Sequence, residues 1–362
     1  MQTPLRFALI GCGRISPNHI AAAKANGLDF AALCDIVPEH MEDKVIKFEL
    51  PENIRRFTDY QDLLREVKPD LVAICTESGL HAPIALDCIE AGCNLIIEKP
   101  IALSIKDADA IIRAAGEKGV KVSACHQNRF NKSIQKIRDA VDKRRFGRMF
   151  HGAAHIRWNR GWEYYSRANW RGTWEQDGGA LMNQCIHNID LLRWMMGEDI
   201  DEVFAYTDRL NHDYIQAEDL GVALVRFKSG AYGLIEGTTN IYPNNLEETL
   251  YLFGEKGTVK AGGQSVNLIE EWRFSDALDD AEQVKKEYHE IPPNVYGFGH
   301  TPLYADVIDA IRTGREPAVT AEDGKRAMEL VLAIYKSAAE GKPVKLPLAD
   351  CATTDFIGRF KP

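Results

Sequence analysis

No apolar stretch in the sequence approaches the roughly 20 residues that a membrane-spanning helix needs. The N-terminus lacks the basic region and long apolar segment that mark a secretory signal peptide. Internal repeats and low-complexity segments are absent as well. We therefore expect a globular protein of the cytoplasm rather than a membrane-spanning, secreted or repetitive one.

The sequence also contains no CxxC pair, although it has eight cysteines. Zinc sites and redox-active disulfides bring cysteines together at short spacings. The cysteines here are scattered, and several lie in apolar runs. We predict buried thiols rather than disulfides or metal ligands.

Positive charge is scarce, because 44 lysine and arginine residues stand against 53 aspartate and glutamate residues, giving a net charge of -9. A nucleic-acid surface relies on a field of basic side chains that face phosphates. We therefore expect neither a nucleic-acid nor a membrane partner. One phosphorylated small ligand is still compatible with this charge if a local arginine cluster binds it.

A chain of 362 residues exceeds what one hydrophobic core usually organises, so its length favours two domains. In residues 1–126, short apolar runs alternate with amphipathic stretches, which is the pattern of βαβ units in a parallel sheet. We predict a doubly wound α/β Rossmann domain there. Its strands are expected at residues 5–10, 30–34, 71–75, 94–97 and 121–125, and its helices at 81–90 and 103–118.

Residues 127–362 have a different texture and predict a second, α+β domain that binds substrate and supports oligomerisation. Alternating apolar and polar residues indicate a large, mostly antiparallel open sheet with one face packed. Thr320 is the expected N-cap of the last helix. The strands expected in this domain include 222–227, 232–239 and 248–253, and its helices are 132–143, 186–194, 302–312 and 322–339.

A glycine-rich turn directly follows the first predicted strand and precedes a helix. Gly11 permits a tight turn, and Gly13 lets the backbone approach a pyrophosphate at the helix N-terminus. Ser16 stands where this motif usually has glycine or alanine, and its hydroxyl could bond a phosphate oxygen. Asp35 ends the second strand, where it can accept hydrogen bonds from ribose hydroxyls and repel a 2'-phosphate. The pattern predicts NAD rather than NADP; the alternative is an ordinary strand-to-helix turn.

Two further segments carry residue types suited to proton transfer. Glu98-Lys99-Pro100 follows the strand at 94–97, at the sheet edge where open α/β folds bind ligands, although a surface lysine in a turn is the alternative. In the second domain, Asn183 and His187 are four residues apart, so on a helix they share one face. On that face they can present an amide and an imidazole to one ligand.

In these motifs and in their order, the sequence resembles the glucose-fructose oxidoreductase, inositol dehydrogenase and MocA (Gfo/Idh/MocA) family over essentially the whole chain. The glycine-rich turn, the Glu98-Lys99-Pro100 segment and the Gly-Gly segment leading to His187 and Asp190 occur in the expected order. So does the closing segment 299–306. Within the family, segments 170–174, 177–179 and 182–184 look most like UDP-N-acetylglucosaminuronate 3-dehydrogenases.

The resemblance implies that Lys99 and His187 handle the proton of the reacting alcohol. Other members often carry aspartate at position 183, but the amide of Asn183 does not titrate and is left to orient the alcohol. Histidine has a reference pKa of about 6.5, whereas the pKa of Lys99 would have to fall by roughly 3 units to act near neutral pH. Either residue can be the immediate base. The cofactor site is predicted to comprise Gly11, Gly13, Arg14, Ile15, Asp35, Thr76, His81, Glu98, Lys99 and Gln127.

A loop between residues 157 and 174 is rich in arginine and holds four of the six tryptophans. Aromatic faces suit sugar or uracil rings, and guanidinium groups suit carboxylate or diphosphate oxygens. The loop reads as a lid over an anionic sugar; packing against a neighbouring subunit is the alternative. Both can hold, because the family often assembles through its second-domain sheet. The predicted substrate residues are Arg160, Tyr165, Trp170, Arg171, Asn183 and His187.

The histidines offer no recognisable metal-ligand spacing with a cysteine or a carboxylate, so we expect no metal site. Those considered were His151, His155, His212 and His300.

The residues predict an NAD-dependent dehydrogenase that oxidises a secondary hydroxyl of an anionic sugar, and the resemblance implies C3 of a nucleotide-linked acidic sugar such as UDP-N-acetylglucosaminuronate. One alternative is the same chemistry on a free cyclitol or aldose. Another is a non-catalytic NAD(H)-binding protein, and transient use of bound NAD for elimination is a further variant. We expect a homodimer or homotetramer.

Overall fold

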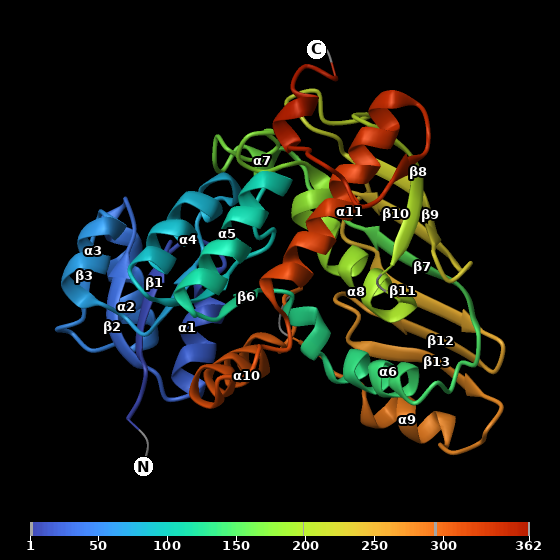
Figure 1. Ribbon diagram of the computed structural model, residues 1–362, viewed down its shortest axis with the longest axis horizontal. Helices are drawn as coiled ribbons and strands as arrows, with labels where there is room; N and C mark the ends of the chain where they lie inside the picture. The colour runs from blue at the N-terminus through green and yellow to red at the C-terminus, as the bar shows by residue number, and fades with distance from the viewer. Residues whose placement is uncertain (1–2, 198, 293–294, 361–362) are drawn as a thin grey trace. The chain divides into compact units, whose positions relative to one another are not determined.

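The computed structural model describes residues 3–197, 199–292 and 295–360, and the chain divides into two compact units (Figure 1). The first unit comprises residues 1–126 and 300–325, and the second comprises residues 127–299 and 326–362. The sequence-based division assigned residues 300–325 to the second domain. The structure instead packs this returning segment with the first unit, so the two units are not consecutive in sequence.

The first unit contains a six-stranded sheet with the strand order β3-β2-β1-β4-β5-β6. All neighbouring strands are parallel, which confirms the predicted doubly wound Rossmann fold. The central strand β4 is fully buried and apolar, and β5 is so after its first residue, Asn94, as a parallel sheet covered on both faces requires. The strands are β1 (Arg6–Ile10), β2 (Asp29–Cys34), β3 (Arg55–Phe57), β4 (Leu71–Ile74), β5 (Asn94–Ile97) and β6 (Val122–Ala124).

The helices of this unit begin and end at recognisable caps. In α5, Ser104 accepts a hydrogen bond from the backbone of Asp107, and Gly119 ends the helix with a φ of 68°. The returning helix α10 is tied to α1 by a hydrogen bond of 3.0 Å from Asn26 Nδ2 to the carbonyl of Thr301. The helices are α1 (Ser16–Ala25), α2 (Pro38–Phe48), α3 (Tyr60–Val67), α4 (His81–Glu90), α5 (Ile105–Lys118) and α10 (His300–Thr313).

The second unit contains an eight-stranded sheet with the order β13-β12-β11-β7-β10-β9-β8-β14. Only β7 and β10 pair in parallel among these described strands, which confirms the predicted mostly antiparallel sheet. The strands are β7 (Met149–Arg157), β8 (Ile200–Asp208), β9 (Leu220–Phe227), β10 (Tyr232–Thr238), β11 (Glu247–Gly254), β12 (Gly257–Gly262), β13 (Leu268–Phe274) and β14 (Val344–Lys345).

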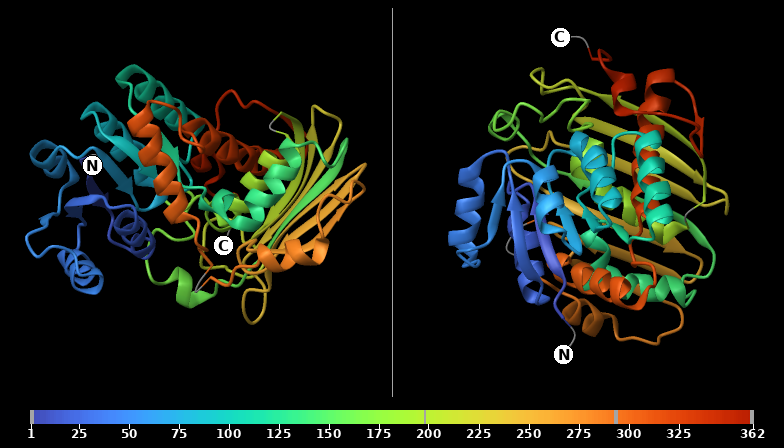
Figure 2. Two further views of the ribbon diagram at one scale, coloured as in Figure 1. Left: turned by 90° about the horizontal axis from the view of Figure 1, so that it is seen from below. Right: turned by 60° about the vertical axis from the view of Figure 1, so that its left-hand side comes forward.

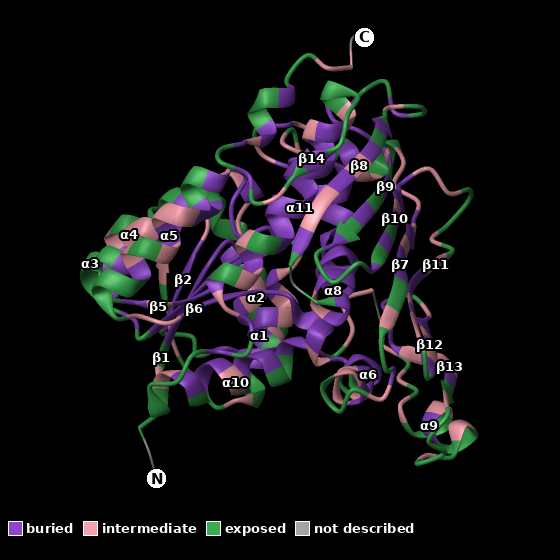
Figure 3. Ribbon diagram, turned by 45° about the vertical axis from the view of Figure 1, so that its right-hand side comes forward, coloured by how far each residue is buried: buried purple, intermediate pink, exposed green. Residues whose placement is uncertain are grey.

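Helices cover one face of this sheet and leave the other open (Figure 2). Glycines on the strands allow the close approach: a Cβ on Gly237 would lie 2.5 Å from the side chain of Leu181, and one on Gly152 would lie 2.8 Å from Leu192. The helix α8 is buried along almost its whole length (Figure 3). The helical elements are α6 (Lys132–Asp142), α7 (Trp162–Tyr165), a π-helix (Leu181–Cys185), α8 (Ile186–Met196), α9 (Ala281–Glu287) and α11 (Ala321–Glu340), whose residues up to 325 belong to the first unit.

Three smaller predictions can also be compared with the structure. Thr320 caps α11, because its hydroxyl accepts a hydrogen bond of 3.2 Å from the amide of Asp323. All eight cysteines are buried, and none of them forms a disulfide. Across the described ranges, no helix combines the length and the apolar character needed to cross a bilayer.

Candidate active site

The glycine-rich turn lies between β1 and α1. Gly11 has a φ of 92°, and a Cβ there would come within 2.6 Å of the backbone carbon of Cys75, so no larger residue fits. At Gly13 a Cβ would meet nothing within 4 Å, which leaves the backbone open to a ligand. The N-cap residue of α1 is Ile15, whose side chain cannot accept the hydrogen bonds of the first turn. These amide groups are suited to a pyrophosphate.

Ser16 and Asp35 hold the turn in place. The hydroxyl of Ser16 donates to the carbonyl of Gly13 at 2.7 Å, so its hydrogen is used inside the protein rather than on a ligand. One carboxylate oxygen of Asp35 accepts from the amide of Cys12 at 2.7 Å, and the other accepts from the amide of Val37 at 2.9 Å. Asp35 thus orders the turn, and its predicted bonds to ribose hydroxyls stay a prediction.

The Glu98-Lys99-Pro100 segment follows β5 at the carboxyl edge of the first sheet. The amide of Lys99 donates to the side chain of Glu98 at 3.1 Å. His81, at the start of α4, lies 2.7 Å through Nδ1 from the carbonyl of Pro100 and 3.2 Å through Nε2 from the carbonyl of Thr76. Burial lowers the pKa of His81, which favours the neutral ring. His81 therefore fixes the position of this segment through its contact with Pro100.

A buried polar cluster in the same unit was not anticipated from the sequence. His19 Nε2 lies 2.8 Å from Glu98 Oε1, and His300 Nε2 lies 3.8 Å from the same oxygen. Together with Cys125 these groups place four donor atoms of metal-binding types within 4.8 Å of one another. The residues come from segments almost 300 positions apart, so no local spacing reveals them.

The predicted pair in the second unit lies at a junction of two helix types. Asn183 belongs to the π-helix and His187 to the first turn of α8, not to one continuous α-helix as predicted. The amide of Asn183 donates to Asp177, and His187 Nε2 lies 3.4 Å from Nε2 of Gln127. Both side chains are about 8% exposed. A π-helix changes the angular offset between positions four apart and is often found at functional sites.

Buried groups anchor the N-terminal end of the π-helix. Glu218 Oε1 accepts hydrogen bonds of 2.7 Å from the amide of Leu181 and from the hydroxyl of Tyr335. Burial raises the pKa of Glu218 to about 8 even though these bonds act in the opposite direction. Gly179 has a φ of 100°, and a Cβ there would collide with Glu218. The Gly-Gly segment is therefore glycine for steric reasons.

A buried ion pair anchors α8. Arg129 donates through Nε and Nη2 to the two carboxylate oxygens of Asp190, each at 2.7 Å, and its guanidinium lies 4.7 Å from the ring of Trp194. Arg129 and Asp190 are both about 2% exposed or less. Asp190, three residues after His187, thus orients the helix that carries the imidazole.

Some residues of the arginine-rich loop are buried or paired within the protein, and others are placed where they can contact a ligand. Arg157 pairs with Glu236 and Glu247 across the sheet, and Trp174 is fully buried against Tyr335. Trp158 is also buried, and so is Tyr165, which the sequence predicted as a substrate residue. Half of the tryptophans in this predicted lid are therefore core residues.

The residues of this loop that can contact a ligand lie around Tyr164. The guanidinium groups of Arg160 and Arg171 lie 5.3 Å and 4.2 Å from its ring, and Trp170 stacks 4.5 Å from Arg171. The Tyr164 hydroxyl accepts hydrogen bonds from Arg171 and from Gln184. These contacts hold two positive charges beside one aromatic ring.

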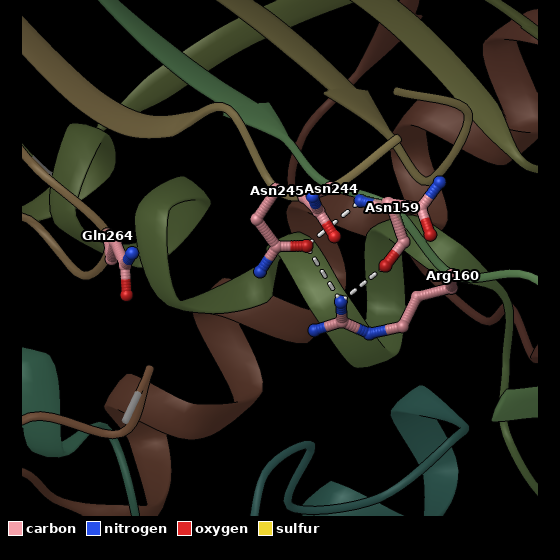
Figure 4. Close-up of a pocket in the computed structure, with 5 residues that line it drawn as sticks. All are labelled: Asn159, Arg160, Asn244, Asn245 and Gln264. Carbon is pink, nitrogen blue, oxygen red and sulfur yellow. Dashed lines mark hydrogen bonds between the residues drawn. The ribbon is translucent and has the colours of Figure 1, made fainter. Parts of the chain in front are cut away.

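A polar pocket of about 370 Å³ lies next to Arg160 (Figure 4). Arg160 Nη1 donates to the side chain of Asn245 at 2.9 Å and to the carbonyl of Asn159 at 2.6 Å. Asn245 also accepts from the amide of Asn159. Asn244 and Gln264 complete the lining. The pocket thus offers amide donors and acceptors beside one guanidinium group.

Residues 5–126 match the family model described as the NAD-binding Rossmann fold of the Gfo/Idh/MocA oxidoreductases, and residues 138–346 match the model of their C-terminal alpha/beta domain. The chain belongs to this family. It is an NAD-dependent oxidoreductase that acts on sugar hydroxyls. The glycine-rich turn described above fits the dinucleotide that this family uses.

Several relatives of this Gfo/Idh/MocA protein have named activities or were solved with ligands bound. The WlbA dehydrogenase of Bordetella pertussis, solved with NADH and UDP-GlcNAcA, is 38% identical with a TM-score of 0.88, and the match covers 95% of this chain and 98% of that one. The WlbA dehydrogenase of Chromobacterium violaceum, with the same ligands, is 37% identical with a TM-score of 0.87, over 96% and 97%. Myo-inositol 2-dehydrogenase of Thermotoga maritima is 26% identical over 94% of this chain and 98% of its own.

Proposed function

We propose that this enzyme oxidises a secondary hydroxyl, at C3, of an acidic nucleotide-linked sugar such as UDP-N-acetylglucosaminuronate. The observation that carries the proposal is the unneutralised charge of Arg171. Its side chain contacts Tyr164 and Trp170, and no carboxylate pairs with it among the described residues. By contrast, Arg157 in the same loop is neutralised by two glutamates. A half-buried cation without a counter-charge suits an anionic ligand.

The pocket beside Arg160 supports a ligand larger than a free sugar. Its lining residues are amides, which can both donate to and accept from ring carbonyls, ring N–H groups and hydroxyls. Gln184 connects Arg160 to Arg171 through Tyr164. Its side chain accepts a hydrogen bond from Arg160 at 3.1 Å and donates one at 2.7 Å to the Tyr164 hydroxyl, which also accepts from Arg171. The relatives solved with UDP-GlcNAcA point to the same ligand class.

For the chemical step we propose Lys99 and His187 as the proton-handling pair. When bound, NAD accepts the hydride from the carbon that bears the hydroxyl. One of the two side chains takes the hydroxyl proton, and Asn183 orients the alcohol through its amide. The turn braced by His81 holds Lys99, and the Arg129–Asp190 pair holds the helix of His187. The remaining predicted cofactor residues, Arg14, Thr76 and Gln127, stay part of this proposal.

The test compares initial rates of absorbance change at the nicotinamide band with NAD and a panel of alcohols. We expect turnover of UDP-N-acetylglucosaminuronate, much weaker turnover of UDP-N-acetylglucosamine, whose sugar lacks the carboxylate, and none in Lys99→Met. A parallel reaction contains a 2-oxo acid, which reoxidises tightly held NADH and is itself reduced; turnover in that reaction is measured as formation of the 2-hydroxy acid. Equal rates for the two sugar nucleotides would refute a role of Arg171 in binding the sugar carboxylate.

A free cyclitol or aldose is the second candidate, and the relatives named as myo-inositol 2-dehydrogenase and D-apiose dehydrogenase favour it. Thermal-shift titration separates the two candidate substrates, because a bound ligand raises the melting temperature by an amount that grows with the ratio of its concentration to its Kd. A shift with myo-inositol but none with UDP would favour this candidate. Binding of NAD with no turnover across the whole panel would favour a non-catalytic role.

We also infer that copies of the chain assemble through the open face of the second sheet. Val222 and Leu224 on β9 and Tyr232 and Leu234 on β10 are between 42% and 55% exposed, and Leu224 and Leu234 are cross-strand partners. Sedimentation of the purified protein tests this inference. We expect a dimer or tetramer that Leu224→Glu dissociates.

A further inference from the structure

The buried cluster around Glu98 joins three parts of the first unit. His19 comes from α1, Glu98 follows β5, and His300 and Tyr304 come from α10. All four side chains are at most 5% exposed. Burying a carboxylate and two imidazoles is costly unless each finds a partner, so the cluster requires an explanation.

The hydrogen bonds form a chain that ends at Glu98. Tyr304 Oη lies 2.8 Å from His19 Nδ1, and His19 Nε2 lies 2.8 Å from Glu98 Oε1. His300 approaches the same oxygen from the other side, with its ring 5.2 Å from that of His19. The second oxygen of Glu98 accepts from the amide of Lys99 at 3.1 Å. Both oxygens of the carboxylate are therefore engaged.

We propose that His19, His300 and Tyr304 are positioning residues that keep Glu98 as a buried carboxylate beside Lys99, and that this charge favours the ammonium form of Lys99. The inference rests on the proposed role of Lys99 in proton transfer. The inference also connects helix α10 with the reaction, because His300 and Tyr304 lie on this helix.

The electrostatics of the cluster agree with this assignment. Burial alone would raise the pKa of Glu98, but the hydrogen bond with His19, the nearby His300 and the charge of Lys99 outweigh burial and hold that pKa well below its usual value. Burial lowers the pKa of His300 and of His81, which faces the segment from α4. These two imidazoles are therefore neutral at neutral pH.

The other titratable groups that face Glu98 carry no negative charge. Burial first, then the nearby carboxylate, raises the pKa of Cys125 after β6 and of Cys75 after β4 well above the ordinary value for a thiol. Burial also raises the pKa of Tyr304 on α10. Glu98 is thus the anion of the cluster, and its field acts on the neighbouring ammonium group through a low-dielectric interior.

The direct test measures the titration of Lys99 without relying on catalysis. The intact protein is labelled with trace acetic anhydride over a range of pH, and peptide mass spectrometry follows the extent of acetylation at Lys99. In Glu98→Gln, which keeps the shape and removes the charge, we expect the midpoint to fall by about one pH unit or more. Asp87→Asn removes one charge elsewhere in the same unit and should leave the midpoint in place.

Two milder variants keep the test informative if Glu98→Gln does not fold. Tyr304→Phe deletes one hydroxyl and should shift the midpoint by a smaller amount in the same direction. His19→Gln retains a donor near the position of Nε2, so the labelling midpoint of Lys99 should stay close to the wild-type value if hydrogen bonding is the role of His19. The acid limb of the kcat profile should move with the labelling midpoint, which a purely structural role would not produce.

Three outcomes overturn the inference. The first is a Lys99 midpoint in Glu98→Gln that equals the wild-type value. The second is a zinc content near one per chain in the purified protein, because these donors would then be metal ligands. The third is a fall in kcat at every pH without a shift of the acid limb. If Lys99→Met retains full turnover, the proposed function of Lys99 fails, while the labelling result still decides the charge effect.

Discussion

Replacing Glu248 by glutamine should stabilise the protein at alkaline pH. Glu248 lies on β11 opposite Ile156 of β7, it is 1% exposed, and its Oε2 atom has no hydrogen-bond partner among the described residues. Burial raises the pKa of its carboxyl group from 4.5 to about 8. The folded protein therefore holds a proton on Glu248 at neutral pH that the unfolded chain releases.

The direction and size of the effect follow from this difference in pKa. The stabilising contribution of the neutral carboxyl is full below pH 4.5, and it is lost as the pH rises toward about 8. Within that window the free energy of unfolding falls by about 1.4 kcal/mol per pH unit. Glutamine carries no charge at any pH. The variant should match the wild type near pH 5 and exceed it by on the order of 4 kcal/mol near pH 8.5.

Urea unfolding at pH 5, 7 and 8.5 measures the difference. Glu218 also has a pKa raised to about 8, but it is present in both proteins and cancels in the comparison. Glu247→Gln is the matched control, because the neighbouring Glu247 is half-exposed and accepts from Arg157 at 2.6 Å. The reasoning is refuted if Glu248→Gln gives no gain that grows with pH, or if Glu247→Gln gives the same gain.

Three further changes test separate parts of the structure. Arg129→Met leaves the carboxylate of Asp190 buried without its bidentate partner, so scanning calorimetry should show a loss of about 3 to 5 kcal/mol; an unchanged melting temperature would contradict this. Gly11→Ala brings a methyl group against the backbone at Cys75, and fluorescence titration should find NADH binding weakened at least about tenfold. Arg171→Lys loses the stacked, forked guanidinium, and the KM for UDP-N-acetylglucosaminuronate should rise about tenfold or more with kcat little changed. Equal KM values for wild type and variant would remove that arginine from the substrate site.

Much of the first unit could be predicted because its strands are short apolar runs between amphipathic segments. The helix predicted at 81–90 coincides with α4, and the strand predicted at 94–97 coincides with β5. The helices α2 and α3 and the strand β3 were not predicted. The strand was missed because its three residues include two arginines and none is fully buried. An edge strand of this kind has no apolar pattern to detect.

Two features of the site depend on tertiary structure and could not be predicted locally. The sequence pattern assumes 3.6 residues per turn, so it placed Asn183 and His187 on one α-helix; the buried anchors Glu218 and Tyr335 instead accompany a π-helical turn. The cluster around Glu98 depends on a helix that returns to the first unit from the far end of the chain. Neither feature leaves a periodic signal in the sequence.

The aromatic and arginine-rich loop shows a different limit of sequence analysis. Composition marks the loop as a ligand site, but it cannot separate Arg171, which has no counter-charge among the described residues, from Arg157, which is neutralised by two glutamates. It also cannot distinguish the buried Trp174 from the half-buried Trp170. Burial and partners decide which members of a composition cluster can meet a substrate.

The most direct test of the central claim is a crystal structure with NAD and UDP-N-acetylglucosaminuronate bound. We predict that Lys99 Nζ and the imidazole of His187 both lie within about 3 Å of the hydroxyl on C3, with the diphosphate or the carboxylate against Arg171. A complex in which that hydroxyl faces neither Lys99 nor His187 would contradict it.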